Sequence, residues 1–179
     1  NIGKAAALFA DWAPAVPVAT INRFCASGLS ATGLMAERAA IQGAVTLAGG
    51  VEMMSRTPMM SDKGIMFANP EVSRQLGALH PGVGADLVAT QFGISRADCD
   101  AYAALSQARA AAAQAAGRFG SIVPVHDAAG ALVLAQDETI RPGTTAEKLA
   151  AMEPAFVAAG QGHDGQTVQR LFPDLGPLA

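Results

Sequence analysis

The side chain best suited to covalent chemistry is that of Cys25, which lies in the stretch INRFCASGLS from Ile21 to Ser30. An apolar, β-branched run ends just before it, and an Ala-rich helical pattern follows. A cysteine on such a strand-to-helix turn lies beside the unpaired N–H groups of a helix start, whose partial positive charge favours thiolate over thiol. This placement makes Cys25 a candidate nucleophile. Its position alone equally allows a small buried cysteine that fills a tight corner.

The hydrophobic pattern predicts the elements that must position this turn. Residues Val16–Asn22 form an apolar run typical of a buried strand, and Ala44–Ala48 form a second one. Between them, Gly28–Gln42 predicts a helix with small or apolar residues on almost every side, and Gly43 suits the position after its end. Strand, helix and strand in this order predict a βαβ unit with a parallel sheet, so the predicted fold class is α/β.

Capping and turn residues predict the elements elsewhere. Ser95 and Asp98 form a capping box at the start of a long helical pattern that Gly117 ends. Apolar stretches on both sides of residues 127–130 predict a β-hairpin. Residues 53–79 and the polar, glycine-rich stretch after residue 154 predict loops. The other expected helices are Ile2–Ala10 with Asn1 as its cap, Ala85–Phe92, and a short one opened by Thr144 and Glu147 and extending to about Met152.

Composition excludes several classes of protein. The 179 residues are 51% hydrophobic and 15% charged, which is enough apolar surface for a sizeable core. A formal net charge of −3 without a Lys/Arg cluster argues against a nucleic-acid-binding surface. No apolar run reaches the roughly 18 residues of a membrane span. The first residue is Asn rather than Met, so we expect a piece of a longer chain.

The cysteines and histidines indicate the cellular compartment and whether a metal site is expected. Two cysteines make a disulfide framework unexpected and suit a reducing compartment, so we expect a cytoplasmic protein. The histidines His80, His126 and His163 are far apart in the sequence, and neither cysteine has a metal-ligand spacing. No metal site is therefore predicted.

The stretch from Val16 to Ser55 resembles the nucleophile region of the thiolase family, the acetyl-CoA acyltransferases. Downstream, the stretches from His80 to Phe119 and from Asp137 to Phe156 resemble the loop domain that this family inserts over its active site. The family motifs N-x-x-C-[AS]-S-G and G-G-x-E-x-M-S are matched at Asn22, Cys25, Ala26, Ser27 and Gly28, and at Gly49, Gly50, Glu52, Met54 and Ser55.

The resemblance implies a segment of the layered α/β/α/β/α thiolase fold. Residues 1–58 would be part of the N-terminal core half that carries the nucleophile. Residues 59–179 would be the loop domain, which is mainly helical with a small hairpin. The C-terminal core half is absent from these residues.

The resemblance also implies the chemistry. Cys25 would take the acyl group from an acyl-CoA as a thioester, with its own backbone N–H in the oxyanion hole. Asn22 and Ser27 would shape the turn, and Gly28 would let the following helix approach closely. The residues expected to contact coenzyme A are His80 at the pantetheine end and Arg141 at the nucleotide end. Coenzyme A and acyl-CoA are substrates here, and no permanently bound cofactor is expected.

Several family motifs are missing. Thiolases complete the reaction with histidines in N-E-A-F and G-H-P contexts and with a second cysteine in C-x-G. Gly162-His163-Asp164 lacks the proline, and Cys99 lacks the glycine, so neither is a match. Pro81, Gly84 and Lys148 also depart from common family residues at the expected coenzyme A contacts. We therefore expect the 179-residue chain alone to be inactive.

Two other interpretations of the function stay open. If the chain is the whole product, it would be a non-catalytic, thiolase-like binding or scaffold protein. A related condensing enzyme of the ketoacyl-synthase type shares the nucleophile turn. For a thiolase, the acyl-chain length and the preferred direction, synthesis or cleavage of 3-oxoacyl-CoA in fatty acid metabolism, stay undetermined.

The same residues predict self-association. The helix Gly28–Gln42 and the run after Gly50 are too apolar to face water. In the thiolase family this region lies near a two-fold interface, so we expect a homodimer or a homotetramer.

Overall fold

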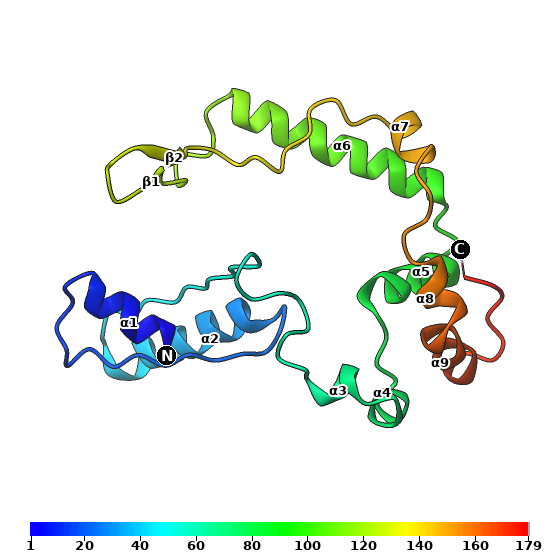
Figure 1. Ribbon diagram of the computed structural model, residues 1–179, viewed down its shortest axis with the longest axis horizontal. Coiled ribbons are helices and arrows are strands. Elements are labelled where there is room, and N and C mark those ends of the chain that lie inside the picture. Colours follow the sequence, from blue (N-terminus) through cyan, green and yellow to red (C-terminus); the bar gives the residue numbers. More distant parts are fainter. Residues whose placement is uncertain (179) are drawn as a thin grey trace. The chain divides into compact units, whose positions relative to one another are not determined.

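The chain divides into two compact units in the computed structural model shown in Figure 1, which describes residues 1–178. Unit 1 comprises Asn1–Asp62, and unit 2 begins at Lys63. The described residues are mostly helical, with one small antiparallel hairpin.

Unit 1 contains two helices, α1 (Ile2–Phe9) and α2 (Ser27–Gln42), and both confirm the prediction. The Asn1 side chain caps α1, because its Oδ1 accepts from the Lys4 amide at 3.1 Å. Helix α2 ends at Gly43, whose φ of 61° lies in the left-handed region that glycine adopts without strain.

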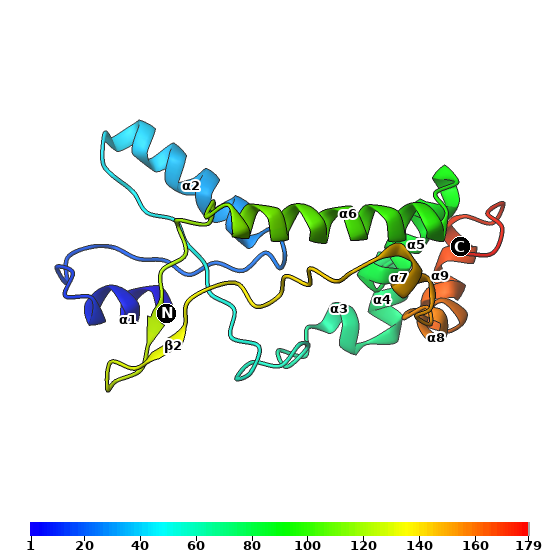
Figure 2. The ribbon, with the colours of Figure 1, turned by 90° about the horizontal axis from the view of Figure 1, so that it is seen from above.

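The two strands predicted around α2 are not formed, so the predicted βαβ unit is wrong for the described chain. Residues 16–22 and 44–48 run without regular structure in Figure 2 and pair with no other described segment. A strand is held by ladder bonds to a neighbour, and these segments have none among the residues described. The second segment is instead tied to α2, since Thr46 Oγ1 donates to the Met35 carbonyl at 2.9 Å.

Unit 2 contains seven helices and the hairpin among its described residues. Helices α6 and α7 lie side by side, as do α8 and α9, and α9 also packs against α5 (Figures 1 and 2). The elements are α3 (Ile65–Ala68), α4 (Pro70–Leu76), α5 (Pro81–Phe92), α6 (Arg96–Ala115), β1 (Val125–His126), β2 (Leu132–Leu134), α7 (Ala146–Ala150), α8 (Val157–Gln161) and α9 (His163–Leu171).

Several predictions for unit 2 are confirmed and others need correction. The capping box at Ser95 and the antiparallel hairpin are present. Helix α5 begins at Pro81 rather than at Ala85, because His80 caps it and a proline fits the first helical position. The cap of α7 is Thr145, not Thr144. Helices α3, α4, α8 and α9 lie where loops were predicted.

The buried core of the described residues lies between α5 and α9. Val83 and Leu87 of α5 meet Val168 of α9 there, and all three side chains are buried. Residues partly buried against them come from before α5 and from the last segment of the chain: Leu79, Phe156, Ala159, Leu175 and Leu178. The segment after Pro154 therefore supplies much of the core of unit 2.

Arg96 joins α7 to α6. Its Nε donates to both carboxylate oxygens of Asp100 at 2.9 Å, and the Asp100 side chain is largely buried. Its Nη2 donates to the carbonyls of Leu149 and Met152, at the end of α7. A guanidinium can serve several acceptors in this way because its five donors have a fixed planar geometry.

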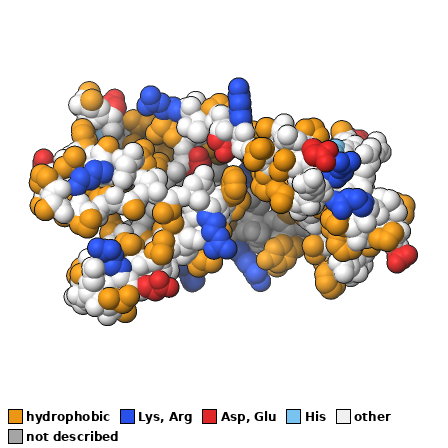
Figure 3. Space-filling model, turned by 90° about the horizontal axis from the view of Figure 1, so that it is seen from below, with side chains coloured by type: hydrophobic (Ala, Val, Ile, Leu, Met, Phe, Trp, Pro, Cys, Tyr) orange, Lys and Arg blue, Asp and Glu red, His pale blue; other side chains and the backbone are white. Residues whose placement is uncertain are grey.

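Large apolar side chains remain exposed in both units, and hydrophobic groups cover much of the face drawn in Figure 3. In unit 1 the exposed fraction is 93% for Phe9, 83% for Ile41 and 76% for Leu29. Apolar side chains exposed to this degree favour association. No helix in the part of the chain that the structure describes is long and apolar enough to cross a membrane.

We expect Ser95→Ala to weaken the start of α6. The Ser95 Oγ accepts from the Asp98 amide at 3.2 Å, and losing such a cap costs about 1 kcal/mol of unfolding free energy. Urea unfolding followed by circular dichroism measures this loss. The control is Ser106→Ala, which removes a hydroxyl from the interior of the same helix, where alanine is the better helix former. Equal stability of both variants would contradict the prediction.

The same capping box makes the stability of the folded state depend on pH. The Ser95 hydroxyl and then its amide N–H donate to Asp98, and these bonds lower the pKa of that carboxyl from its ordinary value of 3.8. A carboxyl with a lowered pKa in the folded state stabilises that state at pH values above its unfolded pKa. This contribution is lost as the pH falls below 3.8 through the lower folded value, and Ser95→Ala should reduce that loss.

Candidate active site

Cys25 lies on a tight turn that leads directly into α2. Its side chain is exposed, and the helix begins two residues later at Ser27. Backbone bonds close the turn: the Ala26 amide donates to the Arg23 carbonyl at 3.1 Å, and the Ser27 amide donates to the Phe24 carbonyl at 3.0 Å. The thiol is therefore accessible and lies at the N-terminal, electropositive end of a 16-residue helix.

Two side chains brace this turn. Asn22 Oδ1 accepts from the Phe24 amide at 2.8 Å. The Ser27 Oγ accepts from the Arg23 amide at 2.7 Å, and its hydroxyl donates to the Phe24 carbonyl at 2.6 Å. Both side chains thus bond to the residues that immediately precede Cys25.

Phe24, next to the cysteine, has a strained backbone. Its φ is 50°, in the left-handed region that a bulky residue rarely adopts. Such a conformation costs about 1–3 kcal/mol and persists where surrounding bonds impose it. Here the Asn22 and Ser27 bonds impose it, and together they fix the direction of the Cys25 backbone.

Gly28 follows the turn inside α2. A Cβ at this position would meet no atom within 4 Å among the described residues. The close helix approach expected for Gly28 is therefore not seen within this part of the chain.

In unit 2, His80 is the cap of α5. The Gly82 amide donates to His80 Nδ1 at 3.2 Å, and the His80 amide donates to Asp164 Oδ2 at 2.9 Å. The imidazole lies 4.9 Å from the Phe156 ring, centre to centre, with the ring planes 36° apart. The ring is exposed but held at a defined place.

Arg141 lies in the loop before α7. Its amide donates to Gln107 Oε1 at 2.7 Å, and its carbonyl accepts from the Thr144 hydroxyl at 2.9 Å. Lys148 of α7 reaches back to this loop, since its Nζ donates to the Gly143 carbonyl at 2.6 Å. Gln107 of α6 therefore anchors the backbone of the loop that presents Arg141.

The predicted residues fall into separate groups. Asn22, Cys25 and Ser27 belong to one turn in unit 1, and Gly28 follows it inside α2. His80 and Arg141 belong to unit 2, where different sets of contacts hold them. Gln107, Phe156 and Asp164 were not predicted to have site roles, because no local pattern pairs them with residues so distant in the sequence.

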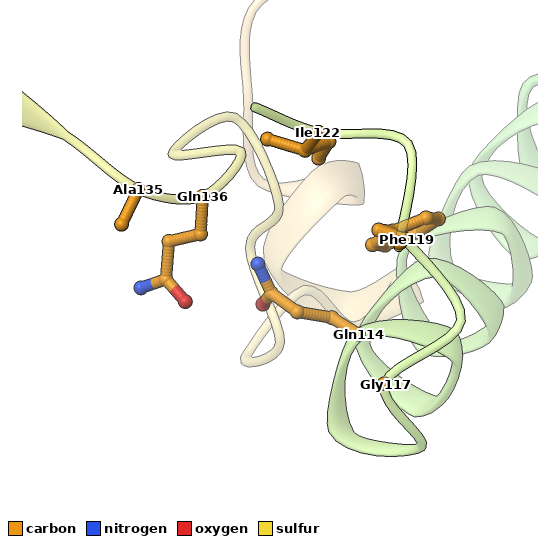
Figure 4. Close-up of a pocket in the computed structure, with 7 residues that line it drawn as sticks. Gln114, Gly117, Phe119, Ile122, Ala135 and Gln136 are labelled. Carbon is orange, nitrogen blue, oxygen red and sulfur yellow. The ribbon is translucent and has the colours of Figure 1, made fainter. Parts of the chain in front are cut away.

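None of the predicted residues lines the cavity drawn in Figure 4. Its volume is about 210 Å³, and it lies beside the end of α6 and the segment that follows β2. That is below the roughly 300–1,000 Å³ of ligand pockets, and no charged side chain lines it. The lining residues are Gln114, Gly117, Phe119, Gly120, Ile122, Ala135 and Gln136.

The residues described contain no cluster of three or more His, Cys, Asp or Glu that could hold a metal ion. The Cys25 turn places an accessible thiol beside backbone amides. A thiol in such a position is a candidate nucleophile.

Comparisons with known proteins relate most of this chain to one family. The family described as "Thiolase, N-terminal domain" matches residues 1–169. The beta-ketoadipyl-CoA thiolase of Pseudomonas putida is 41% identical over 175 residues, which are 86% of this chain and 44% of that protein. The 3-ketoacyl-CoA thiolase of Erwinia tasmaniensis is 44% identical over 163 residues, or 87% of this chain and 41% of that protein.

A solved structure is similar as well. The dimeric peroxisomal thiolase of Saccharomyces cerevisiae superposes with a TM-score of 0.71 at 32% identity. The match covers 88% of this chain and 43% of the yeast chain. This chain thus spans less than half the length of the relatives it matches.

Proposed function

Because this chain belongs to the thiolase family, we propose that it carries the nucleophile of an acyltransferase that forms or cleaves 3-oxoacyl-CoA thioesters. The observation that carries the proposal is the exposed thiol of Cys25 on a braced turn directly before α2. The family motif N-x-x-C-[AS]-S-G coincides with this turn.

The proposed reaction is a two-step transfer through sulfur. In the cleaving direction, the Cys25 thiolate attacks the 3-oxo carbon, and the bond between C2 and C3 breaks. The electron pair of that bond leaves with acetyl-CoA, which takes a proton at C2. Free coenzyme A then attacks the acyl-cysteine thioester, and Cys25 leaves as a thiolate. Condensation is the same sequence reversed.

The Cys25 backbone N–H would stabilise the oxyanion that forms at the attacked carbonyl. Donors of this kind must be fixed in place before the reaction, since their value lies in avoiding reorganisation. The bonds from Asn22 and Ser27, and the strained Phe24, support that role because they hold the backbone immediately before the cysteine.

We further propose that unit 2 contacts coenzyme A. The His80 ring would touch the pantetheine arm, and the Arg141 side chain would pair with phosphate at the nucleotide end. The anchoring of Arg141 through Gln107 supports this role, because a fixed backbone lowers the entropy lost on binding. On this view unit 1 belongs to the N-terminal core half and unit 2 is the loop domain.

Mass spectrometry tests the covalent step. Incubation of the intact protein with acetyl-CoA, followed by proteolysis, should give an acetylated peptide that contains Cys25. The peptide with Cys99 serves as the internal control, since that thiol is also exposed. A label on Cys99 alone would refute the proposed nucleophile, and no label on either would favour a non-catalytic, thiolase-like binding protein.

We propose that the intact protein is a homo-oligomer with the nucleophile near the subunit contact. The exposed apolar side chains of α1 and α2 need cover, and the similar yeast thiolase is dimeric. Light scattering at micromolar concentration should give at least twice the mass of one chain. The mass of a single chain would contradict this proposal.

A further inference from the structure

Asp164 joins the starts of two helices. It lies in the first turn of α9, and its Oδ2 accepts from the amide of His80, the cap of α5, at 2.9 Å. A carboxylate beside helix N-termini is favoured by their partial positive charge, and a bond to an ionised acceptor is stronger than a neutral one. The two partners are 84 residues apart in the sequence.

The contacts around His80 also orient its ring. Because Nδ1 accepts from the Gly82 amide, the neutral ring carries its proton on Nε2. The His80 ring contacts the ring of Phe156, and a Cβ added at Gly82 would overlap that phenyl ring. The imidazole therefore has a fixed tautomer and a fixed tilt, with Nε2 as its available donor.

The base of this arrangement is rigid. Val83 and Leu87, which follow His80 on α5, are buried against Val168 of α9. Thr167 beside it is 2% exposed. Asp164 belongs to one helix of this packed pair, α9, and His80 caps the other helix, α5. The hydrogen bond between them therefore connects the start of α5 to α9.

We propose that Asp164 is a positioning residue for His80. By fixing the His80 backbone, it sets where the imidazole Nε2–H meets the acyl-CoA substrate. This inference rests on the proposed function, in which His80 contacts the pantetheine arm. It gives a role to Asp164, which belongs to none of the family motifs matched in the sequence.

Steady-state kinetics of the intact protein tests the role. Asp164→Ala should raise KM for acyl-CoA roughly tenfold, with a smaller change in kcat, and His80→Ala should have the same effect. Asp164→Asn keeps an acceptor oxygen and should recover most of that loss. The matched control is Asp174→Ala, which removes an exposed carboxylate from the same segment and should leave KM within about twofold of wild type.

A double variant separates positioning from general damage. If Asp164 acts through His80, adding Asp164→Ala to His80→Ala should cause no further rise in KM. Losses that multiply would overturn the proposal. So would an Asp164→Ala variant whose KM equals that of wild type.

Hydrogen exchange of the His80 amide supplies a measurement that needs no turnover. In Asp164→Ala this amide should exchange roughly tenfold faster than in wild type, because its acceptor is gone. If that variant does not fold, the exchange rate of the His80 amide in the wild-type protein tests the proposal. Exchange of this amide at the rate of an unprotected amide would overturn it. If wild type has no activity toward acyl-CoA, the proposed function fails, while the exchange result still tests the Asp164 bond.

Discussion

Replacing Cys25 by alanine in the intact protein should lower kcat for acyl transfer by a factor on the order of 10⁴ to 10⁶. The reason is that a nucleophile and its base act as a unit, so removing one member removes most of the chemical acceleration. The turn itself should survive, because its bonds come from backbone atoms and from Asn22 and Ser27. Coenzyme A release, measured with a thiol reagent, gives the rate.

The matched control is Cys99→Ala. Cys99 is exposed in the first turn of α6, so its replacement should change kcat less than about twofold. Unchanged circular dichroism in both variants would show that the fold is intact. A Cys25→Ala variant that keeps more than a tenth of the wild-type rate would rule out the proposed nucleophile.

The isolated 179-residue chain should turn over acyl-CoA at least 10²-fold more slowly than a complete thiolase. A general base contributes roughly 10²–10⁴-fold to such a step, and unit 1 contains no histidine. The helix start beside Cys25 does not compensate. It favours an anion by about 0.3–1 kcal/mol when exposed, which is less than a factor of ten.

The assay should use coenzyme A release with a complete 3-ketoacyl-CoA thiolase as the positive control. Exposed apolar side chains such as Phe9 and Ile41 make aggregation a competing cause of low activity. Sedimentation before the assay separates the two causes. Activity within tenfold of the complete enzyme would show that the base lies within this chain, with His80 and His163 as the candidates.

Local signals in the sequence predicted helices α1, α2 and α6. Asn1, Ser95 and Gly43 bond or turn the backbone next to themselves, so their effect is visible without knowledge of the rest of the fold. The same type of signal was present at Asn69-Pro70, where Asn69 Oδ1 accepts from the Glu71 and Val72 amides and α4 begins. That helix was predictable and was missed.

Long-range features were not predictable from local patterns. The apolar runs at 16–22 and 44–48 resemble strands, but a strand also needs a neighbour, which the run itself does not specify. Helix α9 is short and mostly polar, and its burial depends on Val168 meeting α5. For the site, the motif identified the Cys25 turn, whereas the Asp164 bond to His80 joins residues with no sequence relation.

The packing of α9 on α5 has a consequence for the order of events during synthesis. The apolar side of α5, with Val83 and Leu87, is covered in part by Val168 of α9, which leaves the ribosome more than 80 positions after either of them. Contacts between residues this far apart in the sequence form slowly, because the chain must lose the entropy of closing a long loop before the contacts stabilise it. The apolar side of the nascent α5 thus lacks the cover of α9 until Val168 has emerged. The cap at His80 is among the last parts of unit 2 to reach its final place.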